Sequence, residues 1–238
     1  MHNAPVDSPP RPPALRATAR TTLALAGCSL LLLTLVALEW RPLMSLDDGI
    51  ARTTHRWAVQ DPVLTRTCRI LTDWVWDPNT MRILVGVVVV WLAWRAAWWT
   101  VGWLVATVAL GTALQQGTKA AVGRDRPVWP DPVDSAHYAA FPSGHAMTAA
   151  MVCGLLVWLL HRQGADRTLW RIALAWALVS VVGVGLTRVW LGVHWFTDVL
   201  GGWLLGALVV AVAVAVFERR APRASAPVAR ASRRETAP

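Results

Sequence analysis

Charged residues are scarce in this chain of 238 residues, at 16% of the total, whereas a typical soluble domain carries about 25%. Hydrophobic residues make up 55%, and the mean hydropathy is +0.42. This composition excludes an ordinary soluble domain, and it excludes intrinsic disorder except at the ends of the chain. Several apolar runs reach about 18 residues, the length that a helix needs to cross a bilayer. The sequence therefore predicts an integral membrane protein with a single all-α bundle domain.

Cysteine is also scarce, with three residues at unrelated positions. Cys28 and Cys153 lie inside apolar runs and Cys68 lies in a polar segment, so their spacing fits neither a disulfide framework nor a metal site. The run around Cys28 continues well past it, whereas the apolar region of a signal peptide ends before its cleavage site. We therefore expect an uncleaved first span.

The aromatic residues are unbalanced, because the chain has one Tyr and sixteen Trp. Trp favours the interfaces between membrane and water. Seven Trp residues fall near the ends of apolar runs: Trp40, Trp74, Trp98, Trp99, Trp170, Trp190 and Trp195. We expect most of them to anchor the protein in the bilayer.

Six apolar segments have the length and composition of membrane spans. They cover residues 21–40, 81–97, 100–120, 142–161, 171–190 and 195–217. Together they predict a membrane domain over 21–217. Residues 1–20 and 218–238 are rich in Arg and lack apolar periodicity, so they are predicted to be disordered tails.

Two segments between the spans have distinct patterns. Within 41–80, apolar residues recur at helical spacing, which predicts an amphipathic helix lying at the membrane interface. These residues are Val63, Leu64, Cys68, Leu71 and Val75. Residues 121–141 are rich in Pro and Asp and are predicted to form a loop.

Basic residues are distributed unevenly between the two sides of the predicted bundle. Six spans place both tails on one side, which carries 13 of the 23 Lys and Arg residues but only four of the 14 acidic ones. This bias predicts cytoplasmic tails in a multi-pass protein of the plasma membrane. The basic residues form clusters suited to anionic lipid headgroups. No nucleic-acid-binding fold surrounds them, so we expect a membrane partner and no nucleic acid.

Residues able to do chemistry gather in three clusters at the outer, extracytoplasmic ends of the spans. They are Lys119, Arg126 and Pro127; Pro142, Ser143, Gly144 and His145; and Thr187, Arg188, His194 and Asp198. Arg and Lys clamp phosphate oxygens, and a helix start with small residues lets backbone N–H groups approach an anion. Two His side chains supply a nucleophile and a proton donor. A carboxylate one helical turn after the second His can hold its ring in one tautomer.

Each cluster also has a purely structural explanation. Lys119 and Arg126 fit basic side chains that reach from span ends toward headgroups, and Pro-Ser-Gly-His fits an ordinary helix start. His194 and Asp198, four residues apart, fit a stabilising pair on one helix face. Arg124 is expected to be solvated or to bridge the loop. The order of the clusters and their common side of the bundle favour a joint site.

In combination, the clusters resemble the signature of the type 2 phosphatidic acid phosphatase superfamily, which includes lipid phosphate phosphatases. That signature reads Lys-x6-Arg-Pro, then Pro-Ser-Gly-His, then Ser-Arg-x5-His-x3-Asp, and the chain matches all three motifs in order. The six-span layout is similar to that of the integral-membrane bacterial members. Thr187 occupies the usual Ser position but keeps a hydroxyl, so we expect activity to survive. The resemblance implies a six-helix transmembrane bundle with its catalytic site at the outer membrane–water interface.

The resemblance implies catalytic roles for three residues. His194 is expected to attack phosphorus and form a phosphohistidine. Asp198 is expected to accept a hydrogen bond from the other ring nitrogen. His145 is expected to protonate the departing oxygen and then to deprotonate the incoming water.

The resemblance also implies a phosphate-binding set. Lys119, Arg126 and Arg188 are expected to neutralise the phosphoryl oxygens. Ser143 and the backbone N–H of Gly144 are expected to hold another oxygen. Because these cations can fill the role of a metal ion, we expect neither a metal nor another cofactor.

The sequence leaves the substrate open. It fits a phosphatase acting on phosphatidic acid, phosphatidylglycerophosphate, diacylglycerol pyrophosphate or a polyprenyl carrier such as undecaprenyl pyrophosphate. A lipid phosphotransferase with the same phosphohistidine is one alternative. A membrane protein that binds or transports lipid without chemistry is the other, although its charges would be expected deeper within the spans. The sequence does not indicate the oligomeric state.

Overall fold

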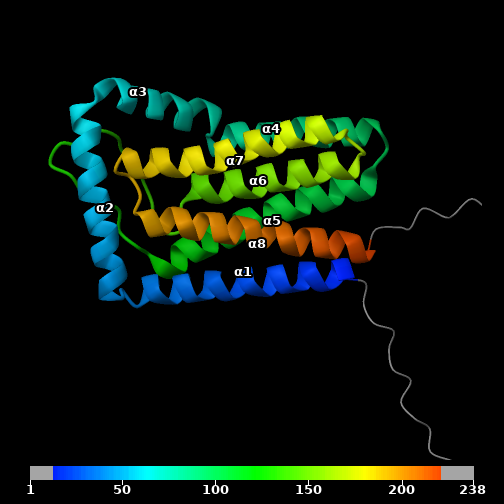
Figure 1. The fold of residues 1–238 in the computed structure, drawn as a ribbon, viewed down its shortest axis with the longest axis horizontal. Helices are drawn as coiled ribbons and strands as arrows, with labels where there is room; N and C mark the ends of the chain where they lie inside the picture. The colour runs from blue at the N-terminus through cyan, green and yellow to red at the C-terminus, as the bar shows by residue number, and fades with distance from the viewer. Residues whose placement is uncertain (1–12, 221–238) are drawn as a thin grey trace, which may run out of the picture.

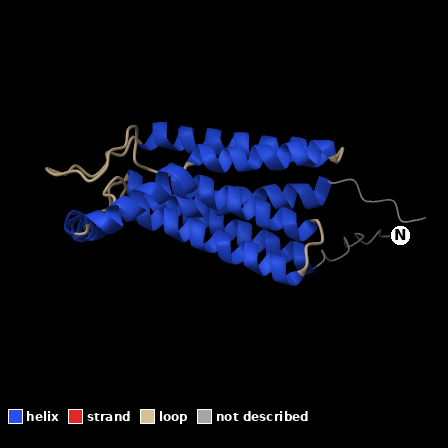
Figure 2. Ribbon diagram, turned by 90° about the horizontal axis from the view of Figure 1, so that it is seen from above, coloured by secondary structure: helices blue, strands red, loops and turns tan. Residues whose placement is uncertain are grey.

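The computed structural model describes residues 13–220, which form a bundle of long helices (Figure 1). In chain order the helices are α1 (Pro13–Ala37), α2 (Arg41–Gln60), α3 (Pro62–Ile70), the π-helical turn η1 (Leu71–Val75), α4 (Pro78–Trp94), α5 (Trp98–Val122), α6 (Gly144–Arg162), α7 (Arg167–Trp190) and α8 (Phe196–Arg220). Loops connect them, and the described residues contain no β-strand (Figure 2). The predicted all-α fold class is confirmed.

Six long helices run alongside one another and correspond to the six predicted spans (Figure 1). Their ends differ from the predicted ends by a few residues, and the largest difference is in α1. This helix begins at Pro13, within the segment predicted to be a disordered tail, and α8 continues to Arg220. Residues 1–12 and 221–238, the rest of the two predicted tails, lie outside the described residues.

Five stretches of the described chain are long and apolar enough to cross a membrane. They are Thr18–Ala37, Pro62–Trp94, Gly144–Arg162, Arg167–Trp190 and Phe196–Arg220. The predicted span in α5 is absent from this set although α5 has 25 residues, because Gln115, Gln116 and Lys119 lower the hydropathy of its second half. α5 nevertheless packs against α4, α6 and α8. Its place in the bundle therefore comes from packing rather than from apolar composition alone.

α2 runs across one end of the bundle, and α3 leads from it back toward α4 (Figure 1). The predicted amphipathic helix corresponds to α3 and η1. Its apolar side chains Val63 and Val75 are exposed, whereas Thr65, Cys68 and Thr72 are buried against the protein. The predicted apolar face is therefore divided, because Val63 and Val75 are exposed, where lipid could cover them, and Cys68 packs against the protein.

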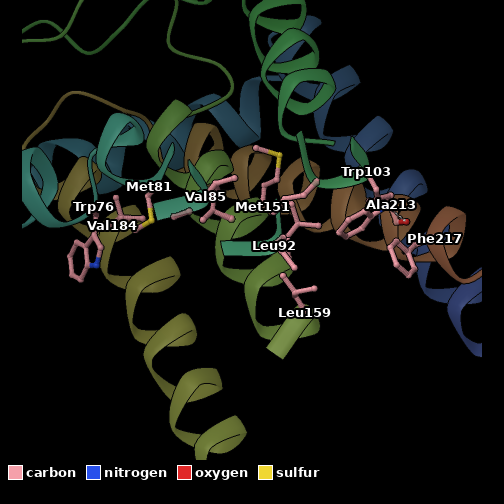
Figure 3. Close-up of a cluster of buried hydrophobic side chains, with 14 residues drawn as sticks. Trp76, Met81, Val85, Leu92, Trp103, Met151, Leu159, Val184, Ala213 and Phe217 are labelled. Carbon is pink, nitrogen blue, oxygen red and sulfur yellow. Dashed lines mark hydrogen bonds between the residues drawn. The ribbon is translucent and has the colours of Figure 1, made fainter. Parts of the chain in front are cut away.

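α6 lies at the centre of the bundle, where it contacts α4, α5, α7 and α8. The main hydrophobic core surrounds it, as Figure 3 shows. Met151 and Leu159 of α6 lie near Leu92 of α4, and Trp103 of α5 lies beside Phe217 of α8. This core holds the long helices together in the part of the bundle away from the end that α2 crosses.

Two glycines allow α8 to approach α6 closely. A Cβ atom added at Gly202 would lie 2.8 Å from the carbonyl oxygen of Ser143, and one added at Gly206 would lie 2.7 Å from that of Met147. Small residues at a helix interface let two backbones approach each other in this way. The backbone N–H of Ser143 donates a 2.9 Å hydrogen bond to the carbonyl of Asp198. The close approach therefore joins the starts of α6 and α8.

The first described turn of α1 and the last turn of α8 lie at the same end of the bundle, opposite α2 (Figure 1). The described ends that lead into the two predicted tails are therefore at one end of the bundle, and the side of the membrane that this end faces stays a prediction. The starts of α6 and α8 lie at the opposite end.

We expect Gly206→Ala to lower the free energy of unfolding by about 1–3 kcal/mol, because the added methyl group would force α6 and α8 apart. Thermal unfolding of the purified protein in detergent, followed by Trp fluorescence, would measure the effect. Gly86→Ala in α4 is the matched control, because a Cβ there meets nothing within 4 Å. Equal unfolding temperatures for the two variants would contradict the proposed role of this close approach.

Candidate active site

Residues of all three sequence motifs converge at the end of the bundle that α2 crosses. Lys119 lies in the last turn of α5 and Arg188 in the last turn of α7. Asp198 lies in the first turn of α8. The ring of His145, at the start of α6, interacts electrostatically with Arg188, Lys119 and, from the other loops, His194 and Arg126. The structure therefore brings the predicted residues into one site.

His194 lies in the short connection between α7 and α8, with only 2% of its surface exposed. Its Nδ1 atom is 3.3 Å from Oδ2 of Asp198, and its Nε2 atom is 3.1 Å from Nη1 of Arg126. A carboxylate only accepts hydrogen bonds and a guanidinium only donates them, so these partners assign the proton to Nδ1. Nε2 keeps its lone pair and faces the cationic side chains. Burial excludes the reading of His194 and Asp198 as a pair on a solvated helix face.

Arg126 is held by the main chain of two loops. Its Nε donates to the carbonyl of Tyr138 at 2.9 Å, and its Nη2 donates to that of His137 at 3.1 Å. Its Nη1 donates to the carbonyl of Val193 at 2.6 Å, beside His194. Carbonyl oxygens orient the guanidinium without cancelling its charge. Arg126 is therefore a fixed cation, which excludes the alternative of a side chain that reaches freely toward headgroups.

The other two predicted cations are also directed into the protein. Lys119 donates through Nζ to the carbonyl of Ala139. Arg188 is 4% exposed, and its Nη1 lies 3.4 Å from Oγ1 of Thr72 and 3.9 Å from Oδ2 of Asp134. The buried Nε of Arg188 has no hydrogen-bond partner among the described residues. An unused buried donor on a guanidinium suits an anionic ligand.

The start of α6 carries two more unused polar atoms. Oγ of Ser143 and Nε2 of His145 are buried and have no partner among the residues that the structure covers. Gly144 lies between them, and a Cβ there would meet Nε2 of Gln115 at 2.4 Å. The side chain of Gln115 therefore lies directly against Gly144 and would have to move if this residue had a side chain. That first turn has free backbone N–H groups, the feature that binds anions at helix N-termini.

Positive charge accumulates in this buried site. Burial and then the neighbouring charge of Arg188 lower the pKa of Arg126 to about 10, although Asp198 opposes the change. Burial also lowers the pKa of His194 well below its ordinary value, and the charges of Arg126 and Arg188 add to the effect. A bound anion would relieve the repulsion among the cations. The neutral ring of His194 is the form that can act as a nucleophile.

Thr187 does not direct its hydroxyl proton toward the site. Its Oγ1 donates a 2.8 Å hydrogen bond to the carbonyl of Val184 in the preceding turn of α7. The hydroxyl that Thr187 keeps at the usual Ser position is therefore engaged with its own helix in this structure.

Two of the Trp residues expected to anchor the bilayer instead support the site. Nε1 of Trp190 donates to Oγ1 of Thr65 at 3.0 Å, and Nε1 of Trp195 donates to the carbonyl of Asp125 at 2.8 Å. These bonds tie the α7–α8 connection to α3 and to the long loop. Trp74 and Trp98 are highly exposed, as expected of interfacial anchors.

Arg124 and Asp47 belong to the site although the sequence does not predict them. The sequence predicts a solvated or loop-bridging Arg124, but its side chain is 11% exposed and lies between two carboxylates. Asp47 is in α2, within the segment 41–80 to which we assigned no chemistry. Its contact with Arg124 spans 77 residues, so no local pattern indicates it. The one available signal for Arg124 is its position two residues before Arg126.

The donor groups of the site do not suit a metal ion. Within residues 13–220, no group of three or more His, Cys, Asp or Glu side chains is placed to hold a metal ion. The two buried carboxylates, Asp47 and Asp198, both pair with Arg124. The described donor set thus favours binding of an anion by cations.

Comparisons with known proteins show the family to which the chain is related. The PAP2 superfamily matches residues 100–222, just over half of the chain. Phosphatidylglycerophosphatase B of Bacillus subtilis (strain 168) is 41% identical over 71 residues, which cover 29% of this chain and 34% of that protein. Undecaprenyl-diphosphatase of Sulfolobus acidocaldarius is 32% identical over 77 residues, which cover 32% of this chain and 33% of that protein. The chain thus spans about a third of the length of these curated relatives.

A solved structure shares the fold. It is the crystal structure of a transmembrane PAP2 type phosphatidylglycerolphosphate phosphatase from Bacillus subtilis, which matches with a TM-score of 0.75 over 85% of this chain and 98% of that one, at 24% identity. All three motifs, from Lys119 to Asp198, lie within the residues that the family matches. The chain belongs to the PAP2 superfamily.

Proposed function

We propose that this protein is a membrane lipid phosphatase that hydrolyses a phosphomonoester or diphosphate headgroup through a phosphohistidine at His194. The geometry of His194 is the single observation that carries the proposal. Asp198 holds the proton on Nδ1, while the unprotonated Nε2 faces a fixed cation, Arg126. A buried imidazole in this tautomer, directed at an anion-binding site, is a prepared nucleophile.

In the first step, Nε2 of His194 attacks phosphorus, and the N–P bond forms as the P–O bond to the lipid breaks. The ring gains positive charge, which Asp198 stabilises through the Nδ1–H hydrogen bond. The negative charge of the bound headgroup offsets the surrounding cations and allows His145 to be protonated, and His145 then gives its proton to the departing oxygen. Neutral His145 then removes a proton from a water molecule, which attacks phosphorus and breaks the N–P bond. Inorganic phosphate leaves, and His194 returns to its starting tautomer.

The phosphoryl oxygens would be held by a set of cations together with hydrogen-bond donors at the start of α6. Lys119, Arg126 and Arg188 supply positive charge where negative charge builds up in the transition state. Oγ of Ser143 and the backbone N–H of Gly144 supply hydrogen bonds at the start of α6. The unused atoms of Ser143 and Arg188 support this assignment. Because these groups already neutralise the phosphate, the proposed reaction uses no metal ion.

A lipid headgroup is the substrate class that the position of the site supports. The catalytic groups lie at the ends of helices that can cross a membrane, which is the depth of lipid headgroups. One relative is named a phosphatidylglycerophosphatase and another an undecaprenyl-diphosphatase. We therefore propose phosphatidylglycerophosphate, phosphatidic acid or undecaprenyl diphosphate as substrate. Because these substrates are lipids, the protein would act while bound to the membrane.

The charge bias supports a site on the extracytoplasmic side of the plasma membrane. The described ends of α1 and α8 lie opposite the site (Figure 1). The basic residues of the chain concentrate on the side of these ends, and basic flanks stay in the cytoplasm. Both termini are therefore assigned to the cytoplasm in this proposal.

His194→Ala is expected to lower phosphate release by about a thousandfold or more, because it removes the nucleophile. The assay offers phosphatidylglycerophosphate, phosphatidic acid and undecaprenyl diphosphate separately to the purified protein in detergent. His161→Ala is the matched control, because His161 lies in the last turn of α6, far along the helix from its start. Transfer of phosphate to an added alcohol without free phosphate would contradict hydrolysis and favour a phosphotransferase. Silence of the unaltered protein on all three lipids would leave a non-catalytic lipid-binding role.

Activity is expected to persist in excess EDTA, because Lys119, Arg126 and Arg188 supply the charge that a metal ion would supply. Phosphate release with and without the chelator measures this. Loss of activity with EDTA, followed by recovery with magnesium, would contradict metal independence.

The sidedness can be tested with cysteine labelling in a chain whose three native cysteines have been replaced by Ser. Tyr138→Cys, in the exposed loop beside the site, is expected to react with a membrane-impermeant maleimide in intact cells. Gln163→Cys, at the opposite end of α6, is expected to react only after permeabilisation. The reverse pattern would place the site in the cytoplasm.

A further inference from the structure

Asp47, Arg124 and Asp198 form a buried cluster of charged side chains. The cluster involves Oδ1 of Asp198, the carboxylate oxygen that does not face His194. Oδ2 of Asp198 faces Nδ1 of His194 and accepts a 2.9 Å hydrogen bond from the backbone N–H of Trp195. Oδ1 accepts a 2.7 Å hydrogen bond from Nη1 of Arg124. Nη2 of Arg124 donates at 2.7 Å to Oδ2 of Asp47. One guanidinium thus bridges the proposed catalytic carboxylate and a second carboxylate on α2.

Asp47 is fixed in place by a full set of partners. Its Oδ1 accepts a 3.0 Å hydrogen bond from the backbone N–H of Thr197, and its Oδ2 accepts from the Thr197 hydroxyl as well as from Arg124. Only 1% of Asp47 and 0% of Asp198 are exposed. Thr197 immediately precedes Asp198, so α2 is attached directly to the first turn of α8. α2 lies outside the segment that the PAP2 superfamily matches.

The charges of this cluster do not cancel. Asp47 and Asp198 carry two negative charges, and Arg124 carries one positive charge, so one negative charge remains. Without Asp47, Arg124 would offset the charge of Asp198 alone, and His194 would face a neutral pair. Charges interact strongly in a buried site because solvent screens them little. The second carboxylate therefore preserves the negative charge that Asp198 presents to the ring.

We propose that Asp47 is a positioning residue for the reaction of His194. Through Arg124 and Thr197 it orients Asp198, and it keeps a net negative charge beside Nδ1 as the ring gains positive charge. The inference rests on the proposed function, since it assigns a further residue to the same phosphohistidine step.

Asp47→Asn tests the charge, because Asn has nearly the same shape and still accepts a hydrogen bond. We expect kcat to fall about 10- to 100-fold, the usual effect of removing a partner that orients a reactive side chain. KM should stay within about twofold, because the contacts of Asp47 are with Thr197 and Arg124 and not with the proposed phosphate-binding residues. Asp48→Asn is the matched control, since this neighbouring carboxylate is 48% exposed and pairs with Arg52 on the surface. It removes the same charge one residue away and should leave kcat unchanged.

The double variant Asp47→Asn/Arg124→Gln separates a charge role from a structural one. It removes one negative and one positive charge, so the cluster again carries one net negative charge. We expect its kcat to exceed that of Asp47→Asn, in which Arg124 neutralises Asp198. It should also exceed that of Arg124→Gln, in which two buried carboxylates without a cation between them would take up a proton and weaken Asp198 as a partner. If the two residues only support packing, the losses of the single variants should multiply. If Asp47→Asn gives no monodisperse protein in gel filtration, the same test can be made by comparing the kcat of Arg124→Gln with that of the double variant.

The outcomes distinguish this inference from the proposed function. An unaltered protein that releases phosphate, together with an Asp47→Asn variant as active as Asp48→Asn, would overturn the role of Asp47 alone. Multiplying losses in the double variant would do the same. An unaltered protein that releases no phosphate from any of the three lipids would overturn the proposed function and this inference with it.

Discussion

Buried positive charge is the constraint on which the rest of the site depends. Lys119 and Arg188 lie in the last turns of α5 and α7, where the partial negative charge of a helix end stabilises a cation. Arg126 is oriented by three backbone carbonyls. Arg188 also interacts with carboxylates, of which Asp134 lies 3.9 Å from its Nη1. These dipoles and carboxylates help the cations to be buried together, and positive charge remains for a ligand to neutralise.

The helix packing fixes the buried cations relative to His194, the proposed nucleophile. Gly202 and Gly206 bring α8 against α6, and the bond from Ser143 to the carbonyl of Asp198 joins the two helix starts. The α7–α8 connection, which carries His194, is held from the other side because Nε1 of Trp129 donates to the carbonyl of Gly192 at 2.9 Å. Gly192 has a φ of 67°, a conformation that favours glycine. Distances in the site therefore follow from backbone contacts, which side-chain motion changes little.

The sequence predicts those parts of the structure that depend on local pattern. The six long helices follow from apolar runs, and the residues of the site follow from three compact motifs. Arg124 escapes prediction because a charged loop residue has no local sign of burial. Asp47 escapes it because its partners are 77 and 150 residues away. Thr187 has the expected hydroxyl, but its own helix supplies a nearer acceptor. The predicted apolar face of α3 and η1 is divided, with Val63 and Val75 exposed and Cys68 buried, because an interfacial helix has both lipid and the protein core beside it.

The two nitrogens of the His194 ring have opposite electrostatic environments, because cations face Nε2 and a carboxylate faces Nδ1. Nε2 faces cations that would attract a phosphate but repel the positive charge that the ring would acquire in the proposed attack. A negative charge at Nδ1 offsets that repulsion, so an Asp198 neutralised by Arg124 would be a poorer partner. The main chain holds the groups on both sides before the substrate arrives, and preorganised charges of this kind need no rearrangement during reaction. Charges of this density are costly in the hydrocarbon core. Their position at the helix ends avoids that cost and matches the depth of a lipid headgroup.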